Sequence, residues 1–304
     1  MLNLKTALLA ALIATTVWFI WAWWSLSQKS KPNVPGEKAQ TWYHSIVAFV
    51  MCFFDTLGIG NFATTTAAFK FKHSIPDEKI PGTLNIGYAL PTVAQALIYM
   101  TIVQVDVWTL VLMIVASVLG AWLGAGVVAK WPRRNIQLGM GVCLIGAAIL
   151  MAMTALKIAP GAGESRSLEG VRLGLGLAGN FALGALMTLG IGLYGPCLIL
   201  VSLLGMNPTA AFPIMMGSCA FLMPIGGIRF VKEGSYAPWT SVVMAIAGIP
   251  ATLIAAFIVK SLALDTVRWL VVVVVIIAAT MMLRSAFAEQ SPARRPDPDG
   301  AAAD

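Results

Sequence analysis

The chain has 304 residues, of which 59% are hydrophobic and only 11% are charged, and its mean hydropathy is +0.84. Soluble domains carry about a quarter charged residues, so this composition excludes a soluble domain and predicts an all-α polytopic membrane protein. The formal net charge of +7 does not indicate nucleic-acid binding. Its basic residues fall in short loops between apolar segments, which is the positive-inside pattern of membrane proteins.

The first apolar segment, residues 5–26, ends in a cluster of tryptophans before Lys29 and Lys31. Such a cluster is typical of the aromatic belt at a membrane interface. The competing interpretation is a signal peptide, because Ser25 and Ser27 offer a small-x-small cleavage pattern. The apolar region is long and bulky, which favours an extra, uncleaved N-terminal transmembrane helix.

The tetrapeptide Leu-Gly-Ile-Gly occurs twice, at residues 57–60 and at residues 189–192, and each copy interrupts a long apolar segment. Glycine lets the backbone leave a helix, and a helix that begins just beyond it offers unpaired N–H groups and the positive end of its dipole. Broken helices at matching places in two halves of a membrane chain indicate a transporter binding site.

The chain divides into two halves with the same order of segments, residues 44–156 and residues 172–284. Three further residue types keep nearly the same spacing between the halves: Pro91 with Pro224, Trp108 with Trp239, and Lys130 with Lys260. We therefore predict two pseudo-symmetric transport repeats and about 7–9 spans, the N-terminal one included. Residues 288–304 are expected to form a disordered cytoplasmic tail.

Basic residues favour one topology. If both broken segments cross the membrane, lysines and arginines divide almost evenly between the two faces. If both are re-entrant hairpins, fourteen of the twenty share one face: Lys29, Lys31, Lys38, Lys70, Lys72, Lys79, Lys130, Arg133, Arg134, Arg229, Lys232, Arg284, Arg294 and Arg295. This asymmetry favours re-entrant hairpins, inverted halves and a cytoplasmic C-terminus. Residues 172–189 are nevertheless long enough to span a membrane.

Asp55 is the acidic residue that lies inside an apolar run, residues 50–56. A carboxylate at mid-membrane depth is costly, so it is functional by default. Two roles remain open at this point. Asp55 is either a proton-coupling candidate or a cap for the half-helix that follows it.

Neutral hydrogen-bond donors follow each glycine break and the start of the next span. A threonine in a buried helix often bonds only to its own backbone. A ring of such donors at helix N-termini nevertheless suits an oxyanion, which binds there without a countercharge. The residues that we predict to bind substrate are Gly58, Gly60, Asn61, Thr64, Thr65, Thr83, Asn85, Gln95, Gly190, Gly192, Tyr194, Ser218 and Cys219.

These features resemble the TauE/SafE family of anion exporters. The shared pattern comprises Gly-Ile-Gly in each break, a later Gly-Thr or Gly-Ser pair, and the basic end of the segment at residues 130–134. The resemblance covers about residues 44–285 and is clearest in the second half, so residues 5–26 lie outside the usual family core. Where the family motif continues with two glycines, this chain has Asn61-Phe62 and Leu193-Tyr194.

The resemblance implies transport of sulfite or an organosulfonate across the bacterial inner membrane. Residues 55–60, together with the threonines at 64–66, look like the branch that contains toluenesulfonate permeases. Because no nucleotide-binding motif occurs, we expect a secondary carrier that works by alternating access, driven by protons or membrane potential or not driven at all. The expected partners are the anion, the lipid bilayer and, as an option, a second copy of the chain.

Three alternatives remain from the sequence: a carrier for another organic anion such as a carboxylate, a channel, and a membrane thiol enzyme that uses Cys197 or Cys219. We expect no enzyme activity, cofactor or metal, because the chain has no HExxH, GxSxG, P-loop or Cys/His cluster. Its four cysteines stand singly in apolar runs, which predicts packing or pocket-lining roles.

Overall fold

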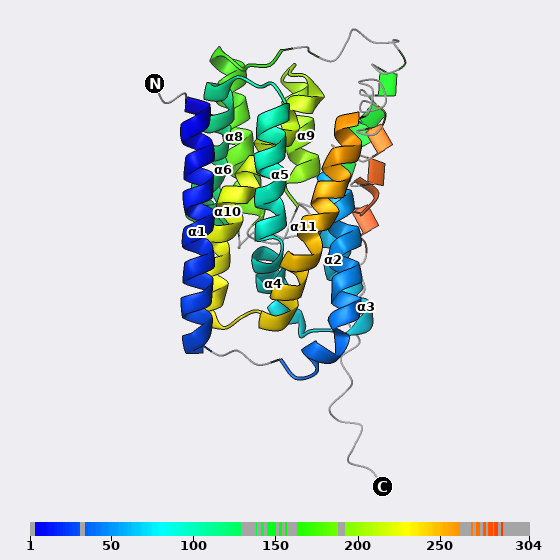
Figure 1. Cartoon of the computed structure of the whole chain (residues 1–304). Coiled ribbons are helices and arrows are strands. Elements are labelled where there is room, and N and C mark those ends of the chain that lie inside the picture. Colours follow the sequence, from blue (N-terminus) through cyan, green and yellow to red (C-terminus); the bar gives the residue numbers. More distant parts are fainter. Residues whose placement is uncertain are drawn as a thin grey trace.

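The structure is a computed structural model that describes residues 4–30, 34–128, 165–187 and 192–261, with isolated residues between 138 and 163 and between 269 and 287. This described part is all-helical, as predicted, with ten α-helices and three short 3-10 helices (Figure 1). The α-helices are α1 (Leu4–Ser30), α2 (Thr41–Thr56), α3 (Phe62–Lys72), α4 (Ile80–Gly87), α5 (Ala89–Ile102), α6 (Val107–Val128), α8 (Gly170–Met187), α9 (Tyr194–Leu203), α10 (Ala211–Glu233) and α11 (Pro238–Ser261). The 3-10 helices are η1 (Glu37–Gln40), η2 (Asp77–Lys79) and η3 (Pro208–Ala210).

Four helices of the described part are long and apolar enough to cross a membrane: Leu4–Lys29, Gly170–Met187, Pro208–Glu233 and Pro238–Ile258. The most apolar stretch of α10 is 83% buried, whereas that of α1 is only 17% buried. Helix α10 therefore forms the centre of the bundle and α1 packs on its outside (Figure 1). The exposed tryptophans of α1, such as Trp21 and Trp24, are placed as an aromatic belt requires.

Helices α2 and α3 form a hairpin that returns to the end of the molecule where it began (Figure 1). The hydroxyl of Tyr43, in the first turn of α2, donates a hydrogen bond of 2.7 Å to the carbonyl of Ala68, near the end of α3. The chain reverses at Gly58 and Gly60, whose φ angles of 101° and 81° lie in the left-handed region that favours glycine. The first glycine break is therefore a hairpin tip.

Helices α8 and α9 form a second hairpin. Ser165, just before α8, forms an isolated β-bridge with Met206, just after α9. The N–H of Asn207 also donates a hydrogen bond of 2.8 Å to the carbonyl of Ser165. The two outer ends of this hairpin therefore lie together, as those of the first hairpin do. Residues 188–191, which include most of the second break, fall outside the described part.

Helices α4 and α5 connect the ends of the molecule from which the two hairpins enter. Helix α4 follows α3 through η2, and the N–H of Asp106, just after α5, donates a hydrogen bond of 2.8 Å to the carbonyl of Arg166 beside the second hairpin. The two hairpins thus enter from opposite ends (Figure 1), and Gly60 of the first and Gly192 of the second line one cavity. Helix α4 ends and α5 begins at Tyr88, and Pro91 lies in the first turn of α5. A first turn accommodates proline because its N–H groups have no partner within the helix.

Helices α6 and α8 approach closely through small residues. A Cβ atom on Gly120 would lie 1.9 Å from the carbonyl oxygen of Phe181, and one on Gly184 would lie 2.0 Å from that of Ser117. Glycine at these positions lets the two helix backbones approach closely. The contact holds α8, and with it one arm of the second hairpin, against the bundle.

Several of the fourteen basic residues grouped by the sequence analysis lie at the end where α2 begins and α3 ends (Figure 1). They are found in η1, η2 and the last turns or ends of α1, α3 and α10: Lys29, Lys38, Lys70, Lys72, Lys79, Arg229 and Lys232. Six others lie outside the described residues: Lys31, Lys130, Arg133, Arg134, Arg294 and Arg295.

Candidate functional site

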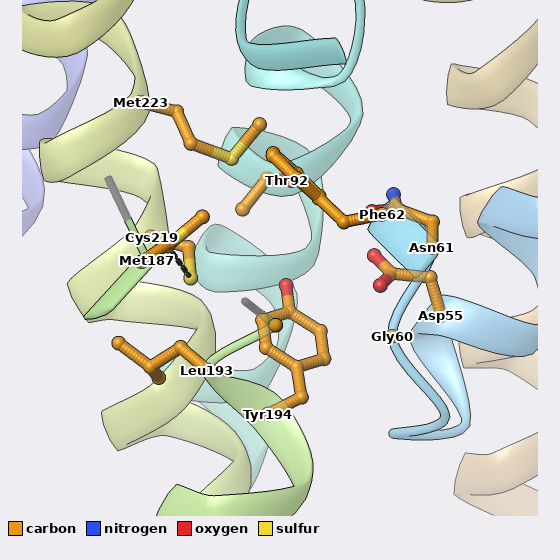
Figure 2. A pocket seen from close by; sticks show the side chains of 11 residues that line it. Asp55, Gly60, Asn61, Phe62, Thr92, Met187, Leu193, Tyr194, Cys219 and Met223 are labelled. Atoms are coloured by element: carbon orange, nitrogen blue, oxygen red, sulfur yellow. Dashed lines mark hydrogen bonds between the residues drawn. The ribbon is translucent and has the colours of Figure 1, made fainter. Parts of the chain in front are cut away.

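A buried cavity of about 20 Å³ lies where the tip of the first hairpin meets the start of α9 (Figure 2). Its lining residues come from both hairpins and from α5 and α10: Asp55, Gly60, Asn61, Phe62, Thr92, Met187, Gly192, Leu193, Tyr194, Cys219 and Met223. A cavity of this size holds about one water molecule. The two hairpin tips are therefore nearly closed on each other in this conformation.

Two helices begin at the cavity. Helix α3 starts after Asn61 and helix α9 starts after Leu193, and neither of these N-cap residues uses its side chain to cap its helix. The first N–H groups of a helix have no partner within the helix, and the dipole places partial positive charge there. Two helix N-termini that face one buried space, neither capped by its own N-cap side chain, provide the chemistry of an anion site.

The carboxylate of Asp55 borders this space and is only 2% exposed. Its Oδ2 accepts a hydrogen bond of 2.8 Å from Nε2 of Gln95. The backbone of Asn61, the residue before α3, also lies near this carboxylate. Asp55 therefore lies beside the start of α3, as the capping interpretation requires, and it also faces the cavity, as a coupling role requires.

Gln95 joins the two hairpins through both ends of its amide. Its Nε2 donates to Asp55 and, over 3.0 Å, to Oγ1 of Thr56. Its Oε1 accepts a hydrogen bond of 2.7 Å from the hydroxyl of Tyr194. Figure 2 shows the Tyr194 hydroxyl and the Asp55 carboxylate directed toward the same space. A hydrogen-bonded chain thus runs from α9 through α5 to α2.

Residues 2–151 of the chain match the family model described as sulfite exporter TauE/SafE. The chain belongs to the TauE/SafE family. No curated protein and no solved structure matches it. TauE/SafE proteins are transporters and not enzymes, so the chain is a multi-pass membrane transporter and the thiol-enzyme interpretation is set aside.

The extent of the match differs from the resemblance found in the sequence. It includes α1, which we had placed outside the family core, and it ends before the second half, where we expected the clearest similarity. Helix α1 also packs against α10 at the centre of the bundle, so it is an integral part of this TauE/SafE fold. The match does not address the toluenesulfonate-permease branch, which stays a prediction.

The structure gathers about half of the predicted substrate residues at the TauE/SafE cavity. Gly60, Asn61, Gly192, Tyr194 and Cys219 line it, and Gln95 bonds to Asp55 and Tyr194 beside it. Gly58 forms the hairpin tip without lining the cavity. Gly190 lies outside the described residues. Gly60 has a left-handed φ, whereas Gly192 does not.

The threonines after the first break make local contacts. The hydroxyl of Thr64 donates a hydrogen bond of 2.9 Å to the carbonyl of Asn61. Thr65 is fully buried, and its hydroxyl lies 2.7 Å from the hydroxyl of Tyr88. Neither side chain lines the cavity, because the turn of α3 directs both away from it. Thr64 therefore bonds to its own backbone, which was the alternative to a role in substrate binding.

Three more residues that we predicted to bind substrate make hydrogen bonds away from the cavity of this TauE/SafE protein. Thr83 accepts a hydrogen bond of 2.9 Å from the N–H of Ala237, and Nδ2 of Asn85 donates to a carbonyl of its own helix, α4. Ser218 accepts one of 3.1 Å from Nδ2 of Asn180. These contacts hold α4 against α11 and α10 against α8. We therefore assign Thr83, Asn85 and Ser218 to packing rather than to the cavity.

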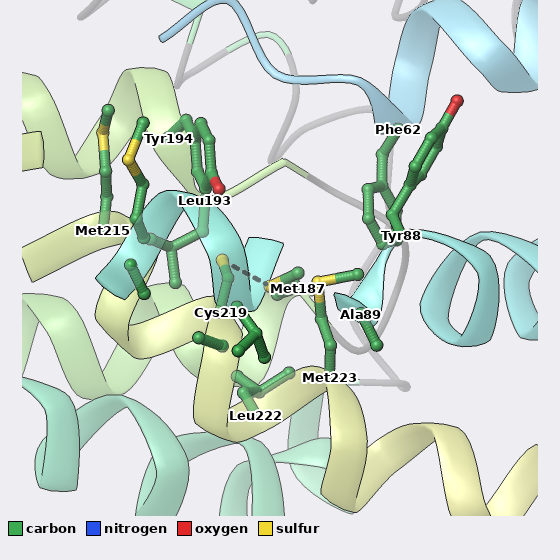
Figure 3. Close-up of a cluster of buried hydrophobic side chains, with 14 of the residues drawn as sticks. Phe62, Tyr88, Ala89, Met187, Leu193, Tyr194, Met215, Cys219, Leu222 and Met223 are labelled. Atoms are coloured by element: carbon green, nitrogen blue, oxygen red, sulfur yellow. Dashed lines mark hydrogen bonds between the residues drawn. The ribbon is translucent and has the colours of Figure 1, made fainter. Parts of the chain in front are cut away.

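The sequence analysis did not predict several residues that line the cavity, because their side chains are apolar or small. They include Thr92, Met223 and Met187, whose Sδ accepts a hydrogen bond of 3.4 Å from Sγ of Cys219 (Figure 3). Met187 stands the same distance after Asp55 as the second Leu-Gly-Ile-Gly stands after the first. That spacing was the signal that could have identified Met187 as a residue of the TauE/SafE site.

Proposed function

We propose that this TauE/SafE protein is a secondary carrier that moves sulfite or an organosulfonate across the bacterial inner membrane by alternating access. The observation that carries the proposal is the meeting of two helix N-termini, those of α3 and α9, at one buried cavity. The hydrogen-bonded chain from Tyr194 through Gln95 to Asp55 spans the same place. Family membership indicates a sulfur anion as the substrate, and the N–H groups at the two helix N-termini are suited to bind it.

The anion would be held by backbone N–H groups at the starts of α3 and α9, with hydroxyl and amide groups beside them. Each hydrogen bond to a charged group contributes about 1.5–3 kcal/mol, so a few such bonds give useful affinity. The present cavity of about 20 Å³ is too small for a sulfur oxyanion. The hairpin tips must therefore separate during transport, which is what alternating access requires.

The entry of the two hairpins from opposite ends supports inverted repeats related through the cavity. A pseudo-symmetric centre of this kind lets one hairpin open while the other stays closed. The basic residues at the outer end of the first hairpin support a cytoplasmic location for that end. This topology also supports the re-entrant interpretation of both glycine breaks.

Asp55 is the proposed coupling group. Its carboxylate and a bound anion would share one small cavity, and like charges at such close range repel each other. A proton on Asp55 removes this repulsion, so proton and anion bind together. In the empty carrier, the ionised Asp55 lies beside the start of α3, where its negative charge takes the place of the anion's.

Flux measurements on the purified protein in proteoliposomes test this proposal. Labelled sulfite, taurine, toluenesulfonate and acetate are offered separately over a range of concentrations. We expect saturable flux of sulfite or a sulfonate and little flux of acetate. Preference for acetate would establish the carboxylate carrier instead, and flux that does not saturate would establish a channel.

A further inference from the structure

A second cavity, of about 50 Å³, adjoins the first. It is lined by Gly60, Phe62, Gly192 and Tyr194, which also line the first cavity, and by five residues that do not: Ile59, Ala63, Gly195, Pro196 and Met281. Four of these five carry only apolar side chains, and the fifth is glycine. The two cavities therefore meet at the glycines and aromatic rings of the two hairpin tips.

The two cavities differ in their chemistry. Asp55, Asn61 and Thr92 bring carboxylate, amide and hydroxyl groups to the first cavity, and none of them lines the second. The rings of Phe62 and Tyr194 border both spaces, and both rings face the first cavity in Figure 2. A ligand that extended past these rings would have a polar part on one side and an apolar part on the other.

We infer that the second cavity is the subsite for the short alkyl group of an alkanesulfonate, whose sulfonate occupies the first cavity once the hairpin tips separate. This inference rests on the proposed function. The volume is several times the ~10–15 Å³ that one water requires, so it fits an alkyl group of a few atoms and is small for an aromatic ring. Phe62 and Tyr194 are then the residues that separate the two parts of the substrate.

The dependence of affinity on alkyl chain length tests the size of this subsite. Each methylene moved from water to an apolar site is worth about fourfold in affinity, which corresponds to about 0.8 kcal/mol. We expect affinity to rise about fourfold from methanesulfonate to ethanesulfonate, and the gain to end once the cavity is full. Sulfite has no alkyl group, so its affinity reports the contribution of the first cavity alone.

Ala63→Leu is the decisive variant. Ala63 lies in the first turn of α3, lines the second cavity and does not line the first. Leucine keeps the helix propensity and fills the space. We expect the ratio of ethanesulfonate to methanesulfonate affinity to fall from about fourfold to about one. Ala67→Leu, one turn further along α3 at a residue that lines neither cavity, is the matched control and should keep the ratio.

Met281→Ala makes the opposite change. It enlarges the second cavity, so the affinity of the variant should rise about fourfold again from ethanesulfonate to propanesulfonate. Affinities are measured by competition against a labelled sulfonate in proteoliposomes. An unchanged chain-length ratio in Ala63→Leu overturns the subsite. A wild-type protein that binds sulfite without any gain along the alkyl series also overturns the subsite but leaves the proposed function standing, whereas one that binds neither sulfite nor sulfonates overturns both.

Discussion

The hydroxyl of Tyr194 donates a hydrogen bond of 2.7 Å to Oε1 of Gln95. This bond joins the second hairpin to α5, and Gln95 passes the connection on to Asp55 in the first hairpin. The hairpin tips cannot separate without breaking one of these bonds. The closed conformation is therefore held by a short polar chain whose acidic end can change its charge.

Replacing Tyr194 with phenylalanine tests this chain. The variant leaves Oε1 of Gln95 buried without a donor, which costs about 1–3 kcal/mol of stability in the closed state. We expect a lower Tm in detergent and a changed transport rate. Tyr99→Phe is the matched control, because the Tyr99 hydroxyl makes a comparable buried bond of 3.0 Å to the carbonyl of Thr56 without lining the cavity. Equal effects of both variants on transport would show that the bond from Tyr194 to Gln95 has no special role.

Asp55→Asn tests proton coupling. Protonation of Asp55 favours anion binding, so the wild-type affinity should rise as the pH falls. Asparagine is always neutral, and its Oδ1 can still accept a hydrogen bond from Gln95. We therefore expect the variant to bind substrate at every pH about as well as the wild type does at low pH. Substrate affinity measured across a pH series gives the result.

The control for this series is Asp106→Asn. Asp106 accepts hydrogen bonds from the backbone N–H and the hydroxyl of Thr109 at the start of α6, away from the cavity. The same chemical change there should leave the pH dependence intact. If Asp55→Asn keeps the wild-type pH dependence as well, Asp55 acts only as a cap for α3.

The sequence predicted the parts of this fold that depend on local chemistry. Glycines that must adopt a left-handed φ marked the first hairpin tip, and the isolated acid in an apolar run marked one wall of the cavity. The rotation of each helix about its axis depends on tertiary packing and could not be read from the sequence. For that reason Thr83 and Ser218 were expected at the cavity but are turned toward neighbouring helices. Met223 carries no polar signal and was not identified.

Labelling of single cysteines tests the topology. In a background without native cysteines, Lys72→Cys and Lys232→Cys should react with a membrane-impermeant reagent from the same side, because both residues lie at the outer end of the first hairpin. Arg172→Cys, at the exposed start of α8, should react from the opposite side. Reaction of the Lys72 and Lys232 positions from different sides would exclude the arrangement of re-entrant hairpins.

The two glycines that line both cavities allow a test of the site itself. Gly60 and Gly192 hold equivalent positions in the two copies of Leu-Gly-Ile-Gly, but the structure separates the two positions. Gly60 has a φ of 81°, where an L-residue costs about 1–2 kcal/mol, so Gly60→Ala should lower stability as well as transport. Gly192 has no such constraint, and no atom lies within 4 Å of the position of its absent Cβ.

Gly192→Ala should therefore keep the Tm of the wild type while it weakens anion binding. Its methyl group enters open space beside a cavity that holds only about one water, and it stands at the approach to the N–H groups of α9. Loss of one hydrogen bond to the anion, about 1.4 kcal/mol, would lower affinity about tenfold. Thermal unfolding and substrate affinity are measured on the same preparation. A Gly192→Ala protein with wild-type affinity would show that the anion does not approach the start of α9, and that the site belongs to the first hairpin alone.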